Sequence, residues 1–281
     1  FLVRNVIPSI GKLDTEDAEF VIRNVFMKRI TNMKGLHEVQ IQTDGAVIPT
    51  PVAVLNAGML LSQGIENQKG LGHILIVDVG GATTDVYSFC ENSGYKGAKI
   101  MGALEPMAKR TVEGDMGMRE SSICIQKEIG VKALVKGAGV TDGMLESGIC
   151  KRMTQTSFIP DSEEEMRIDS ELAKGAIAVA VRRHAGYIEK VLVGCGARIQ
   201  IGKNLTNIET VVGTGGVIVN SPDPSLLMRT MFLRAGESED ILIPRRGVAL
   251  IDREYILFAA GLLKPYDKEV AFNIMKRSIM K

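Results

Sequence analysis

The sequence predicts an α/β fold in which strands and helices alternate along the chain. One observation is the unbroken apolar run at residues 74–77, which is typical of a central strand covered on both faces. A second is that short apolar runs lead directly into glycine, and a third is that long segments carry helical spacing of apolar residues. With 281 residues, of which 45% are hydrophobic, the chain can form one large domain or two modest ones.

The first helices are predicted from their start signals. Residues 14–17 supply an N-cap and first-turn acids, and the apolar spacing that follows predicts a helix to about Ile30. Thr50 and Pro51 predict a second helix through residues 52–61, because the hydroxyl can cap it and proline suits its first position. The segments predicted next are a loop at 64–72, strands at 74–77 and 85–89, and a helix at 119–130.

The second half of the chain continues the alternation. Residues 163–190 carry mostly helical periodicity, with the basic cluster 182–184 toward the end, and predict one long helix. The remaining predicted elements are a loop at 154–162, short strands at 191–193 and 211–212, a helix that starts at Asp223, a loop at 236–240, and a final helix from Asp252 through Leu263.

Charge and cysteine content narrow the functional classes. The chain has 34 Lys and Arg against 33 Asp and Glu, so no net field attracts nucleic acid or an anionic membrane, and neither is expected as a partner. Its four cysteines form no CxxC pair, which leaves zinc and disulfide sites without support and favours reduced thiols. No apolar run reaches membrane-spanning length and no signal peptide is visible, so the prediction is a cytoplasmic protein.

A glycine turn after the central strand is the strongest motif; its residues are Asp78, Val79, Gly80, Gly81, Ala82, Thr83, Thr84 and Asp85. A glycine pair lets the backbone turn sharply and leaves successive N–H groups free to bind phosphate oxygens, with the threonine hydroxyls as further donors. Asp78 at the strand end can hold Mg²⁺ through water. The alternative is a plain glycine hairpin with two solvated aspartates.

Two weaker motifs accompany it. Gly213, Thr214, Gly215 and Gly216 follow a short strand, and such a turn permits close approach to a flat ligand such as adenine or, equally, tight packing of a helix on a sheet. The segment 113–119 places two carboxylates and an arginine at the start of a helix, where acids are also ordinary partners of the helix dipole.

In their order and spacing these three motifs resemble the actin-like ATPase superfamily, which includes Hsp70 and the sugar kinases. The stretches GLGHILIVDVGGATTDVYS at 70–88 and EPMAKRTVEGDMGMR at 105–119 resemble more narrowly the glutamate mutase accessory proteins labelled MutL or GlmL. Further stretches agree at 48–55, at 211–220 and, reading IDREYILFAAGLL, at 251–263. The family is distinct from the mismatch-repair proteins that share the MutL name.

The resemblance implies an actin-like (ribonuclease H-like) ATPase fold with mixed sheets flanked by helices, and ATP and Mg²⁺ as ligands. It divides the chain into the remainder of domain I at 1–70, nucleotide-binding domain II at 71–221, and a C-terminal helical segment at 222–281 that packs back on domain I. The first phosphate hairpin of the superfamily has no match, so an N-terminal part is expected to be missing and the fragment alone is expected to hydrolyse ATP negligibly.

The resemblance also assigns roles to residues. Gly80 through Asp85 match the second phosphate-binding hairpin, and Gly213 through Gly216 match the adenosine motif. Glu113, Gly114 and Asp115 occupy the place of an acidic loop near the nucleotide, and Asp78 and Asp115 are the candidate catalytic carboxylates.

The function implied is an ATP-dependent reactivating factor, a chaperone for an adenosylcobalamin-dependent mutase such as glutamate mutase. Two alternatives stay open. A small-molecule kinase of the same fold would use Asp78 or Asp115 as a base, and a non-catalytic scaffold would bind nucleotide without turnover. Nothing in the sequence predicts the oligomeric state.

Overall fold

The computed structural model describes residues 2–10, 14–15, 17–18, 20–22, 24–25, 48–190 and 197–279. The chain divides into two compact units, residues 1–52 and 53–281. In the first unit, the described residues from 17 to 25 are helical, as predicted from Asp14; the predicted continuation to Ile30 lies outside the described residues. The second unit contains all the sheets described below.

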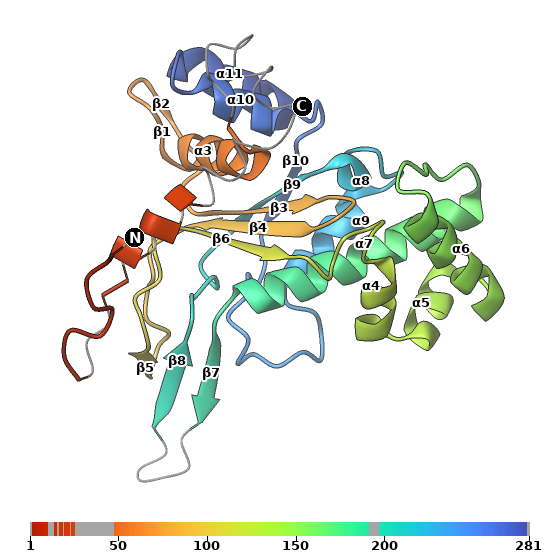
Figure 1. Cartoon of the computed structure of the whole chain (residues 1–281), viewed down its shortest axis with the longest axis horizontal. Helices are drawn as coiled ribbons and strands as arrows, with labels where there is room; N and C mark the ends of the chain where they lie inside the picture. Colours follow the sequence, from red (N-terminus) through yellow and green to blue (C-terminus); the bar gives the residue numbers. More distant parts are fainter. Residues whose placement is uncertain are drawn as a thin grey trace. The chain divides into compact units, whose positions relative to one another are not determined.

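A mixed five-stranded sheet forms the centre of the second unit, in the order β10-β9-β3-β4-β6 (Figure 1). β3 pairs antiparallel with β4, and β4 pairs antiparallel with β6, whereas β9 runs parallel to both β3 and β10. The strands are β3 (Ile74–Val79), β4 (Thr84–Phe89), β6 (Ala108–Glu113), β9 (Thr210–Thr214) and β10 (Val248–Ile251). Because β3, β9 and β10 run parallel, their carboxyl ends lie at the same edge of the sheet.

Helices cover both faces of this sheet, which explains the unbroken apolar run in β3. Leu75, Val77 and Val79 pack into one core, and the alternate residues Ile74 and Ile76 pack into the other. The first core is shared with α4 (Ser122–Ile129), α5 (Val131–Ala138), α6 (Asp142–Thr154), α7 (Glu163–His184), α8 (Gly216–Val219) and α9 (Pro224–Met228). The second is shared with α3 (Thr50–Gln63), α10 (Leu257–Leu263) and α11 (Lys268–Ile279).

The long helix α7 has stabilising residues at both ends. The Ser162 hydroxyl accepts the Glu165 amide at 3.2 Å, three glutamates lie in the first turn, and two arginines and a histidine lie in the last turn. A side-chain cap and charges that oppose the helix dipole both stabilise a helix. α7 packs against β3, β4 and β6 of the central sheet.

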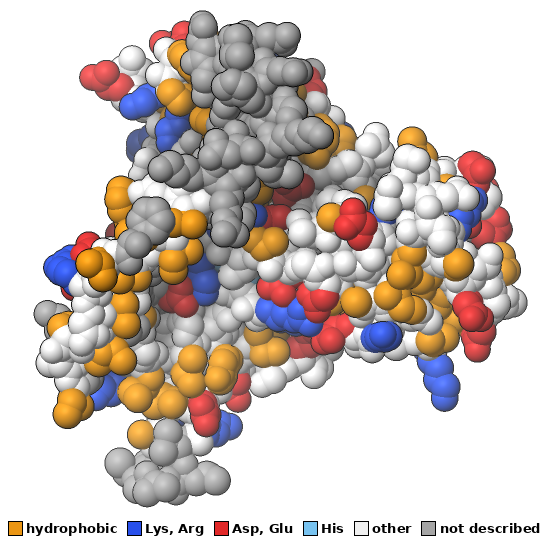
Figure 2. All heavy atoms as spheres, viewed as in Figure 1, with side chains coloured by type: hydrophobic (Ala, Val, Ile, Leu, Met, Phe, Trp, Pro, Cys, Tyr) orange, Lys and Arg blue, Asp and Glu red, His pale blue; other side chains and the backbone are white. Residues whose placement is uncertain are grey.

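Smaller sheets complete the unit. β5 (Ala98–Met101), β8 (Arg198–Ile201) and β7 (Tyr187–Lys190) form a three-stranded sheet away from the central one (Figure 1). β1 (Gly64–Ile65) and β2 (Gln68–Lys69) form a short hairpin. On the face shown in Figure 2, basic and acidic side chains lie interspersed among the described residues. No described helix is both long and apolar enough to cross a membrane.

The structure confirms an α/β fold with mixed sheets flanked by helices, and it confirms the predictions that correspond to α3, α4, β3, β4, β9 and α9. The prediction of a plain loop at 64–72 is wrong, because β1 and β2 pair there. The helix predicted through Lys190 ends at His184, because Ala185 is extended (ψ 162°) and the Gly186 amide bonds to the Lys203 carbonyl at 2.7 Å. The strand predicted at 191–193 lies outside the described residues.

The final helix begins five residues later than predicted. α10 starts at Leu257, and Asp252 precedes it at the end of β10. The Asp252 carboxylate accepts hydrogen bonds from the amides of Ile256 and Leu257 at 3.2 and 3.0 Å. Asp252 therefore caps the helix as predicted, but a turn separates it from the first helical residue. Strands β5, β6, β8 and β10 were not predicted individually.

Candidate functional site

The hairpin between β3 and β4 presents backbone N–H groups at its tip. The Gly80 amide closes the turn on the Thr83 carbonyl at 2.9 Å, and the amides of Met118 and Arg119 bond to the carbonyls of Gly80 and Gly81 at 3.1 and 2.8 Å. The carbonyl groups of Gly80, Gly81 and Thr83 are therefore occupied by hydrogen bonds within the fold. Gly81 and Ala82 are exposed, and their amides find no acceptor among the described residues. Two free amides at a turn make an anion-binding site.

The hydroxyls of the same turn are engaged within the fold. Thr83 Oγ1 donates to Asp85 Oδ2 at 3.0 Å, and Thr84 Oγ1 donates to the Met116 carbonyl at 2.8 Å. Asp85 is neutralised by Arg110, whose Nε lies 2.8 Å from Oδ1. Phosphate contact by these side chains stays a prediction, and the backbone at the tip is the part of the hairpin that is available to a ligand.

Asp78 lies directly opposite Asp85 across the hairpin and beside Thr214 of β9. Burial, together with the nearby carboxylates of Asp85 and Asp252, raises the pKa of Asp78 to about 6. The Asp78 backbone takes part in the sheet, but no hydrogen bond or ion pair to its carboxylate is formed within the described residues. The Arg110 guanidinium lowers this pKa in part, but it is paired with Asp85, so the Asp78 carboxylate is partly buried and has no ion-pair partner of its own among the described residues.

The donor set around Asp78 fits magnesium only if a nucleotide supplies the other ligands. Nowhere in the described ranges do three His, Cys, Asp or Glu side chains gather as a metal site. Mg²⁺ commonly binds through one or two carboxylates, water and substrate phosphates. Asp78, near the end of the strand that leads into the turn with the free amides of Gly81 and Ala82, can supply such a carboxylate.

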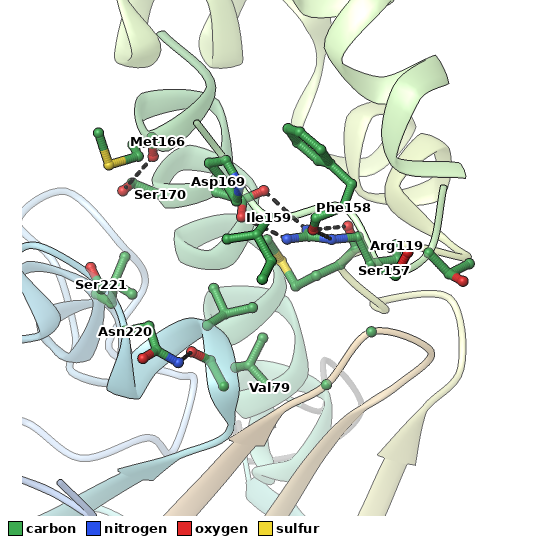
Figure 3. A pocket seen from close by; sticks show the side chains of 18 of the residues that line it. Val79, Arg119, Ser157, Phe158, Ile159, Met166, Asp169, Ser170, Asn220 and Ser221 are labelled. Carbon is green, nitrogen blue, oxygen red and sulfur yellow. Dashed lines mark hydrogen bonds and ion pairs between the residues drawn. The ribbon is translucent and has the colours of Figure 1, made fainter. Parts of the chain in front are cut away.

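A cavity of about 560 Å³ opens beside the hairpin (Figure 3). This volume is within the range of small-molecule sites. Its lining comes from the hairpin tip, the loop that precedes α7, the first turns of α7, and α8 with the segment after it; these residues include Gly80, Gly81, Phe158, Ile159, Met166, Ser170, Gly216, Asn220 and Ser221. The hairpin and the glycine turn after β9 thus meet at one cavity, as expected if they hold two parts of one ligand.

The four residues of the second glycine motif have different surroundings. A Cβ atom at Gly213 would lie 2.5 Å from the Met228 sulfur, so this glycine is needed for packing. Gly215 has a φ of 97°, and its Cβ would lie 2.4 Å from the Val79 carbonyl oxygen. Gly216 alone lines the cavity and has no atom within 4 Å of its Cβ position. The buried Thr214 hydroxyl donates to Asp252 at 2.9 Å.

Arg119 forms one wall of the cavity. Its guanidinium makes a two-point ion pair with Asp169 of α7, and its Nε donates to the Phe158 carbonyl at 3.2 Å (Figure 3). Arg152, which is fully buried, also donates to Asp169 at 2.7 Å and pairs with Glu165. The network fixes the loop that carries Phe158 against α7.

The acidic loop after β6 does not line this cavity. Glu113 and Asp115 both pair with Arg183 near the end of α7, at 2.9 and 2.8 Å, and both raise the pKa of Arg183. The Gly114 carbonyl accepts the Ser121 hydroxyl at 2.7 Å. The roles of Glu113, Gly114 and Asp115 near a nucleotide therefore stay predictions, and the same is true of catalysis by Asp115.

Several lining residues were not singled out from the sequence. Phe158 and Asp169 carry no motif, and Asn220 follows the glycine turn without any distinguishing spacing. Tyr255 lies in the stretch 251–263 that carried part of the family resemblance, but its type and spacing gave no functional signal. Such residues are recognised only once the fold brings α7, β10 and the hairpin together.

Comparison with known proteins adds an independent observation. A family model described as MutL protein matches residues 1–279. The chain is 38% identical over 284 residues to Protein MutL from Clostridium tetanomorphum, in an alignment that covers 100% of the chain. It spans 61% of the length of that relative.

Proposed function

Because the chain belongs to the MutL protein family, that of the glutamate mutase accessory protein and not of mismatch repair, we propose that it acts as an ATP-dependent reactivating factor. The client would be an adenosylcobalamin-dependent mutase such as glutamate mutase. ATP with Mg²⁺ would bind in the cavity beside the β3–β4 hairpin.

One observation carries the nucleotide-binding part of this proposal. The exposed amides of Gly81 and Ala82 lie at a turn that borders the cavity, and the partly buried carboxylate of Asp78 precedes this turn near the end of β3, although Asp78 does not itself line the cavity. The amides suit phosphate oxygens and the carboxylate suits the accompanying cation. At the other side of the cavity, Gly216 leaves space for the nucleoside.

The sheet topology supports the actin-like form of the fold. Three strands, β3, β4 and β6, form an antiparallel meander, and β9 and β10 then join parallel to β3. Ligands of open α/β sheets bind outside the carboxyl ends of the strands. The hairpin, Thr214 and Asp252 all lie at that edge, where β3, β9 and β10 end.

In the proposed mechanism, transfer of the γ-phosphoryl group of bound ATP to water, which gives ADP and phosphate, would drive the cycle. The hairpin amides would orient the phosphates, Asp78 would hold the magnesium ion, and the loop at 156–160 with α7 would border the nucleoside. Binding would shift the population toward a closed arrangement of two domains, and that movement would loosen the mutase enough to release a damaged cobalamin.

Phosphate release tests this function. The full-length gene product, which is the longest form of the protein, is incubated with ATP and Mg²⁺. The incubation is done with and without mutase that has been inactivated by damaged cobalamin. We expect release that the inactive mutase stimulates, together with recovery of mutase activity. ADP formed only with an added hydroxyl acceptor would identify a kinase, and nucleotide binding without turnover would identify a scaffold.

A further inference from the structure

Tyr255 has a backbone conformation that its side chain disfavours. It has a φ of 51° and is the one non-glycine residue with positive φ among those described. A bulky residue in this region is strained, whereas glycine adopts it freely. Strained residues of this kind persist where their surroundings impose the conformation, and they concentrate at ligand sites.

Asp252 imposes the conformation. Its carbonyl accepts the Tyr255 amide at 2.9 Å, and its fully buried carboxylate accepts the next two amides, of Ile256 and Leu257. The same carboxylate accepts the hydroxyls of Thr214 at 2.9 Å and Ser278 at 2.7 Å. The turn is thus anchored to β9 and to α11.

The side chain that this turn presents lies at the cavity. Tyr255 is 43% exposed, lines the cavity together with Gly80, Gly81 and Gly216, and makes an edge-on ring contact with Phe258. Burial and the carboxylates of Asp78 and Asp252 raise the pKa of its phenol. The hydroxyl therefore stays protonated at neutral pH and can donate a hydrogen bond close to the phosphate hairpin.

We propose that Tyr255 is a ligand-contacting residue whose hydroxyl donates to a phosphate oxygen of the nucleotide bound in this cavity. The assignment rests on the proposed function. It explains why a strained tyrosine faces the space between the hairpin and the second glycine turn. It also gives the hydroxyl a role separate from that of Asp78, which binds the cation and not the phosphate.

The test measures binding of Mg·ATP and of adenosine by calorimetry in the longest form of the protein. Tyr255→Phe keeps the ring and removes the hydroxyl, and we expect about tenfold weaker ATP binding or more, since hydrogen bonds to charged groups are strong. Adenosine binding should not change. Tyr187→Phe, at a tyrosine that is 47% exposed in the separate three-stranded sheet, is the matched control.

A second variant separates a ligand contact from a structural role. Tyr255→Gly removes the strain, so we expect a higher melting temperature together with weaker ATP binding. Unchanged ATP binding by Tyr255→Phe, or equal losses for ATP and adenosine, would overturn the phosphate contact alone. Absence of nucleotide binding by the wild-type protein would instead overturn the proposed function, and the assignment of Tyr255 with it.

Discussion

Arg119 and Asp169 form a two-point ion pair in the wall of the cavity, with Nη1–Oδ1 at 3.0 Å and Nη2–Oδ2 at 2.8 Å. Arg119 also bonds through its amide to the Gly81 carbonyl and through Nε to the Phe158 carbonyl. One residue thus joins the hairpin turn, the loop before α7, and α7 itself. Replacement of Arg119 therefore removes side-chain contacts to the loop and to α7 at once.

Replacement of Arg119 should therefore cost stability. Arg119→Met leaves Asp169 buried with Arg152 as its one remaining ion-pair partner among the residues that the structure describes, and we expect a loss of about 3 kcal/mol in the free energy of unfolding. Arg167→Met removes surface ion pairs to Glu163 and Glu164 and one hydrogen bond to the Ala138 carbonyl, and should cost less, about 1 kcal/mol. Urea unfolding measures the free energy of unfolding of both variants. Equal losses would show that the buried Arg119–Asp169 ion pair contributes no more to stability than contacts at the surface.

The two adjacent glycines of the second motif should respond differently. Gly215→Ala should lower the free energy of unfolding by about 2 kcal/mol, because its positive φ and the Val79 carbonyl leave no room for Cβ. Gly216→Val should leave stability nearly unchanged and abolish ATP binding, because its side chain would enter the cavity.

The control for Gly216 is Gly143→Val. Gly143 also lies in the first turn of a helix, with no atom within 4 Å of its Cβ position, and it is outside this cavity. Thermal unfolding and calorimetry of the three variants check the prediction. Tight ATP binding by folded Gly216→Val would mean that the glycine turn serves packing only.

Asp78 should make stability depend on pH. Its pKa is about 6 in the folded protein against 3.8 ordinarily, so the folded state binds more protons between about pH 4 and pH 6. Stability from this group is then lost as pH rises through that window. In the absence of magnesium, Asp78→Asn should be more stable than wild type by about 1–3 kcal/mol at pH 8, and nearly equal to it at pH 4.

The buried His184 makes stability depend on pH in the opposite direction to Asp78. Burial lowers the pKa of His184, so its contribution to stability is lost as pH falls below about 6.5. The difference between Asp78→Asn and wild type isolates the carboxylate, since both proteins keep His184. Asp161→Asn, at a side chain that is 77% exposed, serves as control. A difference that does not grow with pH would contradict the raised pKa of Asp78.

Variants of Asp115 and of its partner Arg183 distinguish a structural role of the acidic loop from a catalytic one. Its ion pair with Arg183 is partly exposed, so Asp115→Asn and Arg183→Ala should each change the free energy of unfolding by about 1 kcal/mol or less. If Asp115 is catalytic, ATP hydrolysis by the longest form of the protein falls strongly in Asp115→Asn only. Equal turnover by both variants and wild type would remove Asp115 from the site.

Local signals explain which parts of the structure could be predicted. The apolar run before Gly80 predicts a buried strand and a turn, since both depend on adjacent residues, and the Thr50–Pro51 pair predicts the start of α3 for the same reason. The pairing of β10 with β9 depends on residues almost 40 positions apart, and nothing in the short segment 248–251 indicates it.

The site shows the same division. The sequence predicted the two glycine turns, but it could not distinguish Gly215, which packs against Val79, from Gly216, which faces the cavity. That difference depends on how β3 lies beside β9. The pairing of Arg183 with Asp115, 68 positions away, likewise depends on where α7 crosses β6.

Calorimetric titration of the longest form of the protein with ATP, in the presence and absence of Mg²⁺, tests the central claim most directly. We predict one site per chain with magnesium-dependent affinity, unaffected by Gly143→Val and abolished by Gly216→Val. Absence of heat with wild-type protein, or binding that survives Gly216→Val in a folded variant, would show that the cavity beside the β3–β4 hairpin is not a nucleotide site.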